Sequence, residues 1–389
     1  MKGYRREEFE LLRRAIFFNW ASLSPPPRSA IERLKRTLMF DERDTIPLEK
    51  QSEQMRNEAA TLLNARQSEI ACPGSSTTQG IQLAIDSINP SAGENMVTAS
   101  IEFPTAGFEA IRLRRKGVEV RVADCGDGRV DADRIEKLAD DRTRVILVSG
   151  VNWITGYRTD IRRIAEIAEN RGAYLVVDAV QQMGASAIDV RRTEPDFIAA
   201  GGQKWLFSPF GAALLFVNRK RSDELEEPYP SLNNTVEPEE GWPSYFANEE
   251  NDPFDVRQPV RTARRFEHGG WLNHFGMIGL AESLKIINSI GIERVERRIG
   301  ELYDYAAEQI QNAGGRIISS LEPDERSSIL TFRLRDSWKS HLDIVNALAA
   351  RGCILSCRGA AGVGGIRMAI HCFNDEEDVD RMMEEIRRF

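Results

Sequence analysis

Short apolar runs alternate with amphipathic stretches over residues 68–217, and this alternation predicts the fold class. The apolar runs are continuous rather than alternating with polar residues, which is typical of parallel strands covered on both faces. The stretches between them carry apolar residues at helical spacing. Strands are expected at 96–100, 118–124, 144–149, 173–178, 196–201 and 211–217, and helices near 105–116, 131–139 and 160–172. We therefore expect an α/β domain around a mainly parallel sheet.

The remaining pattern predicts how the chain is divided. The N-terminal stretch "MKGYRREEFELLRR" is charged and amphipathic and lacks the apolar segment of a signal peptide. Residues 1–20 are expected to pack on the small domain. A large domain is expected over 21–265, and a helical connection with a small C-terminal α+β domain over 266–389. Residues 224–264 are acidic, proline-rich and aromatic. A loop this long is either a lid over a site or a disordered surface excursion.

The composition of the chain argues against several classes of function. The 389 residues carry a net charge of −8, which argues against a general role in binding nucleic acid. No apolar run approaches ~20 residues, so no membrane span is expected. The five cysteines form no CxxC pair and the four histidines show no metal-ligand spacing. We therefore expect no bound metal, no disulfide framework, and a cytoplasmic location.

Two polar residues at the ends of predicted strands are the first candidates for chemistry. Asp178 ends the run "LVVD", and ligands of open α/β sheets bind just outside the carboxyl ends of their strands. Lys204 lies in "AAGGQKWLF", where apolar surroundings favour the neutral, nucleophilic amine. Each residue also has a plain structural interpretation. Asp178 would be a turn or helix-cap acid, and Lys204 a surface lysine packed on Trp205.

A hydroxyl-rich turn at 75–78, in "ACPGSSTTQG", is the third candidate. It precedes an amphipathic helix, and free N–H groups with hydroxyls at a helix start bind phosphate. Simple helix capping is the alternative. Together, a phosphate site, an acid for a ring nitrogen and a lysine for an aldehyde match the three functional groups of pyridoxal 5′-phosphate.

With these motifs in this order, the chain resembles the class V aminotransferase group of fold-type I pyridoxal-phosphate enzymes. This group includes cysteine desulfurases, kynureninases and isopenicillin N epimerase-like proteins. The resemblance runs from "FFNWASLSPPPRSAIE" to "IRMAIHCFNDEEDVDRMMEEI", nearly the whole chain. It implies a fold-type I transferase that builds its sites across a homodimer interface. It also implies cofactor-binding roles for Ser76, Thr77, Thr78, Phe103, Asn152, Asp178, Gln181, Gln203 and Lys204, with Lys204 as the Schiff-base lysine and Asp178 as the partner of the ring nitrogen.

The sequence departs from the pattern of this group at several positions. Gln203 stands where histidine is common, and Gly201 stands where the group has a serine that contacts phosphate. Trp153 falls where asparagine is common, so Asn152 is the expected substitute. In "RRFEHGGWLNHF", either Gly270 or Trp271 stands where a threonine of the partner subunit reaches the phosphate.

The substrate is expected to be an amino acid. Arg367, in "GGIRMAIHCFN", resembles the arginine of the group that binds a carboxylate bidentately, and Arg358 is a second candidate. A strand arginine in a surface ion pair is the plain alternative for Arg367.

The cofactor-binding residues do not determine which reaction the enzyme catalyses on its amino-acid substrate. Desulfurases need a thiolate on a mobile loop, and the matching loop "CRGAAGVGGIR" offers only Cys357, at its strand end. We therefore expect a reaction through Cα deprotonation of the aminotransferase or isopenicillin N epimerase type. A cysteine desulfurase or C–S lyase is the alternative, and a non-catalytic α/β binding protein is a more distant one.

Overall fold

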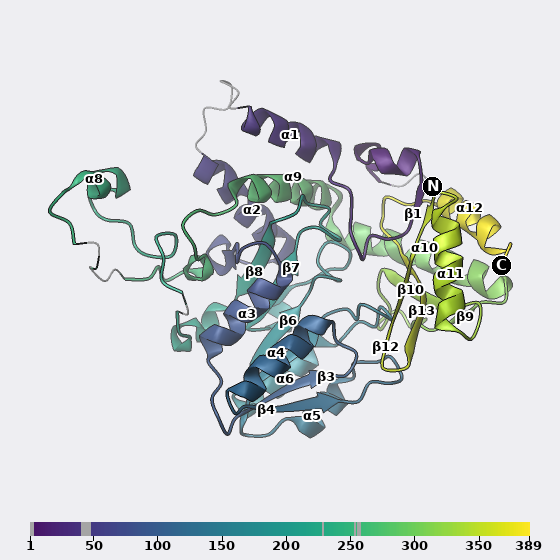
Figure 1. The fold of residues 1–389 in the computed structure, drawn as a ribbon, viewed down its shortest axis with the longest axis horizontal. Helices are drawn as coiled ribbons and strands as arrows, with labels where there is room; N and C mark the ends of the chain where they lie inside the picture. The colour runs from purple at the N-terminus through teal and green to yellow at the C-terminus, as the bar shows by residue number, and fades with distance from the viewer. Residues whose placement is uncertain (1–3, 40–47, 228, 253, 255–257) are drawn as a thin grey trace.

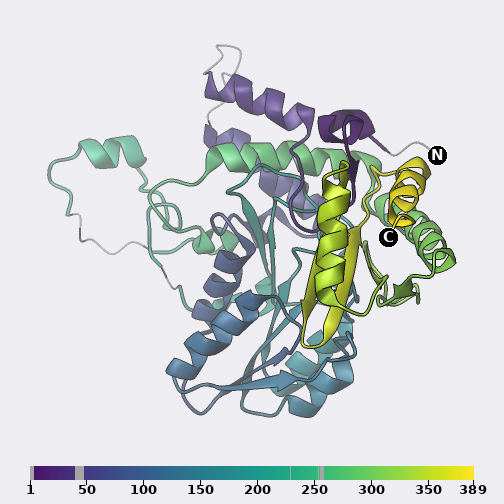
Figure 2. The same ribbon diagram turned by 45° about the vertical axis from the view of Figure 1, so that its right-hand side comes forward.

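A computed structural model of the chain describes residues 4–39, 48–227, 229–252, 254 and 258–389. Figure 1 shows a large α/β body and a smaller group of helices and strands from the C-terminal part of the chain. The first described residues of the chain and its C-terminal end lie on the side of the smaller group in Figures 1 and 2.

A seven-stranded sheet forms the centre of the large body, in the order β2-β8-β7-β6-β5-β3-β4. Neighbouring strands from β4 to β7 pair in parallel, whereas β8 is antiparallel to both β7 and β2. The strands are β2 (Ile70–Ala71), β3 (Asn95–Ala99), β4 (Glu119–Ala123), β5 (Thr143–Ser149), β6 (Tyr174–Asp178), β7 (Phe197–Gly201) and β8 (Ala213–Val217). The predicted mainly parallel sheet is therefore confirmed.

The β4 strand differs from the prediction that every strand is covered on both faces. It lies at the edge of the sheet, and its Val122 side chain is 44% exposed. An edge strand has a neighbour on only one side, so its apolar run alone does not establish burial. The central strands β5, β6 and β7 are buried almost throughout, as expected.

Helices cover both faces of the sheet. Successive strand residues alternate between two separate apolar clusters, so each face has its own core. The α6 helix shows the predicted pattern: its apolar residues Ile161, Ile164 and Ile167 are buried, and it ends at Gly172, whose φ is 68°. The helices of the large body are α1 (Arg28–Leu38), α2 (Leu48–Leu63), α3 (Thr77–Ile88), α4 (Pro104–Arg115), α5 (Ala132–Leu138), α6 (Ile161–Arg171), α7 (Val190–Thr193) and α9 (His274–Ile290).

The smaller group is an antiparallel sheet packed against helices around a third core. Its strands run in the order β12-β13-β10-β9, with β9 at Arg316–Ile317, β10 at Ile329–Arg333, β12 at Ser356–Ala360 and β13 at Val363–Ala369. Its helices are α10 (Ile292–Asn312), α11 (Trp338–Ala349) and α12 (Glu376–Ile386).

The N-terminal segment lies against this smaller group. The short strand β1 (Ile16–Phe17) pairs with β11 (Cys353–Ile354), and Nη1 of Arg6 lies 2.6 Å from Oδ2 of Asp378. The domain limits at 20/21 and 265/266 stay predictions.

The long loop predicted at 224–264 carries one short helix, α8 (Trp242–Ala247). Figures 1 and 2 show α8 projecting away from the large body, on the side opposite the smaller group. Residues 228, 253 and 255–257 of this loop lie outside the described residues. No single described helix is long and apolar enough to cross a membrane, although α9 and α10 pass that test as a pair bent by 77°.

Candidate active site

The residues singled out as chemical candidates meet at the carboxyl edge of the sheet. Asp178 ends β6 and is paired in register with Ser149 of β5 and Ala199 of β7. The next strand, β7, ends at Gly201, and Lys204 follows three residues later. Parallel strands end at a common edge, so Asp178 and Lys204 are brought together there.

Asp178 is a buried carboxylate, only 7% exposed. Its Oδ1 accepts the N–H of Val180 at 3.0 Å. Burial raises the pKa of Asp178, while that N–H and the nearby charge of Lys204 lower it. A buried carboxylate in this position is stabilised by a cationic or N–H partner.

The Lys204 ammonium is destabilised by its surroundings. Burial lowers its pKa to about 8, against the opposing effect of Asp178 and with further lowering by Arg367 and Arg358. Its Nζ lies 5.3 Å from the centre of the Phe103 ring. A lysine with this pKa has a substantial neutral fraction near physiological pH, and the neutral amine is the nucleophile. The alternative of an ordinary surface lysine does not fit this half-buried position, which faces the Phe103 ring and interacts with the Asp178 carboxylate.

Phe103 precedes α4, and its ring packs edge-on against Trp153, with centres 5.4 Å apart and planes at 89°. The Trp153 Nε1 donates to the carbonyl of Ile101 at 3.1 Å. Trp153, which replaces the expected asparagine, therefore supports the ring that the resemblance places on the cofactor.

Asn152 is fully buried and uses both ends of its amide within its own surroundings. Its Nδ2 donates to the Ile101 carbonyl, and its Oδ1 accepts the N–H groups of Ile154 and Thr155. The residue shapes the loop that carries Trp153. A direct cofactor contact by Asn152 stays a prediction.

The hydroxyl-rich turn is tied to the strand that leads to Lys204. Ser76 caps α3 by accepting the N–H of Gln79, as the capping alternative predicts. Thr77 Oγ1 accepts the N–H of Gly201 at 2.8 Å, and Thr78 shares a hydrogen bond with Thr105 at 3.0 Å. The same turn thus caps a helix and contacts the end of the strand that leads to Lys204.

Arg367 is 1% exposed and is surrounded by neutral acceptors. Its Nη1 donates to the Trp153 carbonyl at 2.7 Å, its Nη2 to Ser22 Oγ at 2.7 Å, and its Nε to Ser356 Oγ at 3.1 Å. Burial and the like charge of Arg358 lower the pKa of Arg367 to about 9. No acid of the described residues pairs with it, so the surface ion-pair interpretation is excluded for this part of the chain.

Ser22 is a site residue that no sequence motif predicts. Its Oγ accepts from both Arg367 and Arg358, and the segment around it crosses the site. Gln181 Nε2 donates to the Ala21 carbonyl at 3.1 Å, and Gln181 Oε1 accepts from Trp205 at 2.8 Å. Gln181 therefore anchors the Ser22 segment, and its predicted contact with the phenolic oxygen stays a prediction.

Glu102 is not predicted by a motif either. Its Oε1 accepts the N–H of Ser149 at 2.8 Å, and its Oε2 accepts the Ser149 hydroxyl. Burial raises the pKa of Glu102 to about 7, with a further contribution from Asp178. The site thus holds two acids whose charges repel one another.

The cysteines do not present a thiol on this side, and all five lie in the described residues. Ser356 faces Arg367 in register across the β12–β13 hairpin, so Cys357 points to the other face and packs on the small core. The other four are buried. The loop "CRGAAGVGGIR" is a hairpin, which turns through Ala361 and Gly362 with φ of 47° and 80°.

The positions expected to reach a partner subunit lie at the surface. The Trp271 side chain is 83% exposed, and a Cβ on Gly270 would meet nothing within 4 Å. Their contact with a partner's phosphate site stays a prediction.

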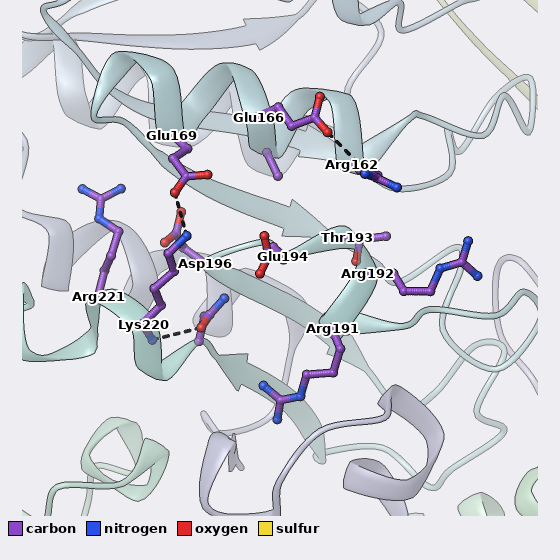
Figure 3. Close-up of a pocket in the computed structure, with 12 residues that line it drawn as sticks. Arg162, Glu166, Glu169, Arg191, Arg192, Thr193, Glu194, Asp196, Lys220 and Arg221 are labelled. Atoms are coloured by element: carbon purple, nitrogen blue, oxygen red, sulfur yellow. Dashed lines mark hydrogen bonds and ion pairs between the residues drawn. The ribbon is translucent and has the colours of Figure 1, made fainter.

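A separate cavity opens at the amino edge of the sheet, where β7 begins and β8 ends (Figure 3). Two ion pairs, Lys220–Glu169 and Arg162–Glu166, join charged side chains of its lining. It contains none of the predicted site residues. In the described residues, no group of three His, Cys, Asp or Glu side chains is placed to hold a metal ion.

Comparisons with known proteins find relatives and solved structures that are similar over nearly the whole chain. The chain is 26% identical over 404 residues to a probable cysteine desulfurase of Methanothermobacter thermautotrophicus, covering 98% of this chain and 96% of that protein. The fold resembles the apo cysteine desulfurase of Thermococcus onnurineus NA1, with a TM-score of 0.84, 20% identity, and 100% and 99% of the two chains covered. It also resembles the cystine C–S lyase C-DES in complex with cysteine persulfide, with a TM-score of 0.86, 18% identity, and coverage of 98% and 99%.

The model of one family, Aminotransferase class-V, matches residues 45–382. That span contains Asp178, Lys204 and Arg367, the residues that meet at the carboxyl edge. The chain therefore belongs to the class-V aminotransferase family and is a pyridoxal-phosphate-dependent enzyme.

Proposed function

We propose that the protein is a C–S lyase that cleaves a sulfur-containing amino acid by β-elimination. One observation carries the proposal. Arg358 and Arg367 lie near Lys204 and form no ion pair with a described acid, while no described cysteine presents a thiol on the Lys204 side of the β12–β13 hairpin. The arginines can thus bind the carboxylate of an amino acid, and the enzyme offers no thiol to accept its sulfur. The similarity to cysteine desulfurases and to a cystine C–S lyase supports a sulfur amino acid ahead of the aminotransferase or epimerase activity expected from the sequence.

The residues present fit pyridoxal phosphate. The buried Asp178 carboxylate suits a protonated ring nitrogen, and the Thr77 turn offers hydroxyls and helix N–H groups to a phosphate. Phe103 would cover one ring face, and Gln203 would add an amide donor near the phosphate. When bound, the cofactor supplies an electron sink for the charge that develops as the substrate Cα loses its proton.

Residues of the chain itself bind the substrate, transfer the proton and exclude water. The Arg367 guanidinium binds the substrate α-carboxylate and fixes the orientation of Cα. The neutral Lys204 amine accepts the Cα proton, and the resulting ammonium can return a proton to the product. Phe103 and Trp153 exclude water from the reacting face. The balanced reaction consumes an S-substituted cysteine and water and releases a thiol, pyruvate and ammonia.

Product analysis of the holoenzyme tests this function. We expect pyruvate, ammonia and a thiol or persulfide from cystine or an S-substituted cysteine, and we expect no product from the Lys204→Ala variant. Cys357→Ser should retain full activity. Alanine as the product, together with loss of activity in Cys357→Ser, would instead indicate a desulfurase. A keto-acid-dependent new amino acid, or inversion at Cα alone, would indicate transamination or epimerisation.

A further inference from the structure

A second cavity, of about 620 Å³, lies next to the one in Figure 3, on the face of the sheet that α6 covers. Its lining includes Val177 of β6 and Ile198 of β7, which are paired in register. Parallel strands are usually joined by a long helix across the sheet face, but the crossover from β6 to β7 carries only the four-residue α7. The crossover therefore leaves a hollow over these two strands, and its size suits a small molecule.

The Gln182 side chain is a buried polar group in the lining of this cavity. It is only 6% exposed, and no described residue forms a hydrogen bond with its amide. Its Oε1 fills the space that a Cβ on Gly150 would take, so the amide is held in place. A buried amide offers two donors and an acceptor and is costly when they are left unpaired. Gln182 therefore indicates that an uncharged hydrogen-bonding group enters the cavity.

Three cations line the cavity, and one of them is available to a ligand. Arg158 pairs with Glu296, and Arg162 pairs with Glu166. Arg192 pairs with no acid in the described part of the chain, and Figure 3 shows its side chain directed away from the acids of the neighbouring cavity. Arg192 can thus receive a carboxylate at the rim.

The three acids of the lining show the same pattern. Asp160 caps α6 by accepting the N–H of Arg163 at 3.0 Å, and Glu325 pairs with Arg129. Asp324 is exposed and has no cationic partner among the residues that the structure describes. One cation and one acid are therefore left at the rim, and this pair is complementary to the two charges of an α-amino acid.

We propose that this cavity binds an α-amino acid whose side chain has an apolar stem and an uncharged hydrogen-bonding end. The carboxylate binds Arg192 and the ammonium binds Asp324. The stem packs on Val177 and Ile198, and the end of the side chain pairs with the Gln182 amide. The cavity is distinct from the active site, because Asp178, Lys204 and Arg367 do not line it. This ligand is therefore a second one, bound apart from the substrate.

Glutamine is the probe that carries all of these groups. Calorimetry on the holoenzyme with Arg367→Gln, a change that weakens binding at the active site, should show one glutamine bound per subunit. The absorbance of the cofactor reports active-site binding and should stay unchanged. Leucine, which lacks the side-chain amide, should bind about 5-fold more weakly. Glutaramate lacks the ammonium and 4-aminobutanamide lacks the carboxylate, and each should bind about 3-fold more weakly than glutamine.

Variants of the lining assign each contact. Arg192→Gln should weaken glutamine and glutaramate but not 4-aminobutanamide, whereas Asp324→Asn should weaken glutamine and 4-aminobutanamide but not glutaramate. Gln182→Met should remove the preference for glutamine over leucine. Arg163→Gln changes an exposed arginine of α6 that pairs with Glu136 outside the cavity, and it should leave every affinity unchanged.

Two results would overturn the proposal. One is the absence of any glutamine binding beyond that at the active site. The other is a set of affinities that Arg192→Gln, Asp324→Asn and Gln182→Met all leave unchanged, since the cavity would then hold only water. Arg192 and Asp324 are exposed, so their substitution is not expected to prevent folding.

Discussion

The Gln203 side chain occupies the space beside Gly201. A Cβ on Gly201 would lie 2.5 Å from Gln203 Oε1, closer than real Cβ atoms approach, and 3.2 Å from Thr77 Oγ1, which is a tight contact. The resemblance to the family places a serine at the first position and a histidine at the second. The two departures are therefore coupled, because the glutamine needs the room that the glycine leaves.

This coupling predicts that Gly201→Ser alone is unfavourable. The new side chain would displace Gln203 and disturb the hydrogen bond from the Gly201 N–H to Thr77. We expect the Kd for pyridoxal phosphate, measured by fluorescence quenching, to rise about 10-fold, and Gly201→Ser/Gln203→His to recover most of the loss. Effects of the two substitutions that add within about 0.5 kcal/mol would show that the positions are independent.

The lowered pKa of Lys204 predicts how the apoenzyme takes up its cofactor with pH. Only the neutral amine attacks an aldehyde, and a pKa of about 8 means that its fraction rises as the pH increases toward 8 and levels off above it. The rate of reconstitution should therefore rise about tenfold per pH unit below 8, followed by absorbance near ~410–430 nm. Lys204→Ala should show no such band. A rate that keeps rising to pH 10 would contradict the lowered pKa.

Glu102 predicts a stability that falls with rising pH. Because its pKa is raised to about 7, the folded protein binds a proton at Glu102 that the unfolded chain releases above its ordinary value of 4.5. Folding stability is thus lost as the pH rises between these two values. Glu102→Gln should remove this component in urea unfolding of the apoenzyme at pH 5, 6, 7 and 8. Glu308→Gln, an exposed control, should leave the pH dependence unchanged. A wild-type curve parallel to that of Glu102→Gln would contradict the assignment.

The sequence predicts most of the fold because strand and helix periodicity is a local property. The expected helix at 160–172 and the strand at 173–178 lie within one residue of α6 and β6. The edge position of β4 was not predictable from its apolar run, since it depends on strand order.

The site residues likewise fall into those that local sequence predicts and those that only the fold reveals. Asp178 and Lys204 were found because each ends or follows a strand and matches a motif. Ser22 was missed because it lies 336 residues from Arg358 in sequence and has no motif of its own. Asn152 matched a motif by type, but the fold uses its amide to shape the loop, and only tertiary contacts reveal this.

The ion pair between Arg56 and Glu267 predicts a large stability effect far from the chemistry. Their side chains are 2% and 0% exposed, Nη2 lies 2.6 Å from Oε2, and Glu267 also accepts the N–H of Cys72 at 2.8 Å. Arg56→Met would leave the buried carboxylate with only the exposed Arg264, whose Nε lies 3.6 Å from Oε2, so we expect a loss of about 3–5 kcal/mol in the free energy of unfolding by urea. Arg56→Met/Glu267→Met should recover part of that loss, because two apolar side chains leave no unpaired charge.

Arg14→Met, which breaks an exposed pair with Glu10, should cost at most about 1 kcal/mol. A cost for Arg56→Met as small as that of Arg14→Met would mean that Glu267 finds another partner or takes up a proton.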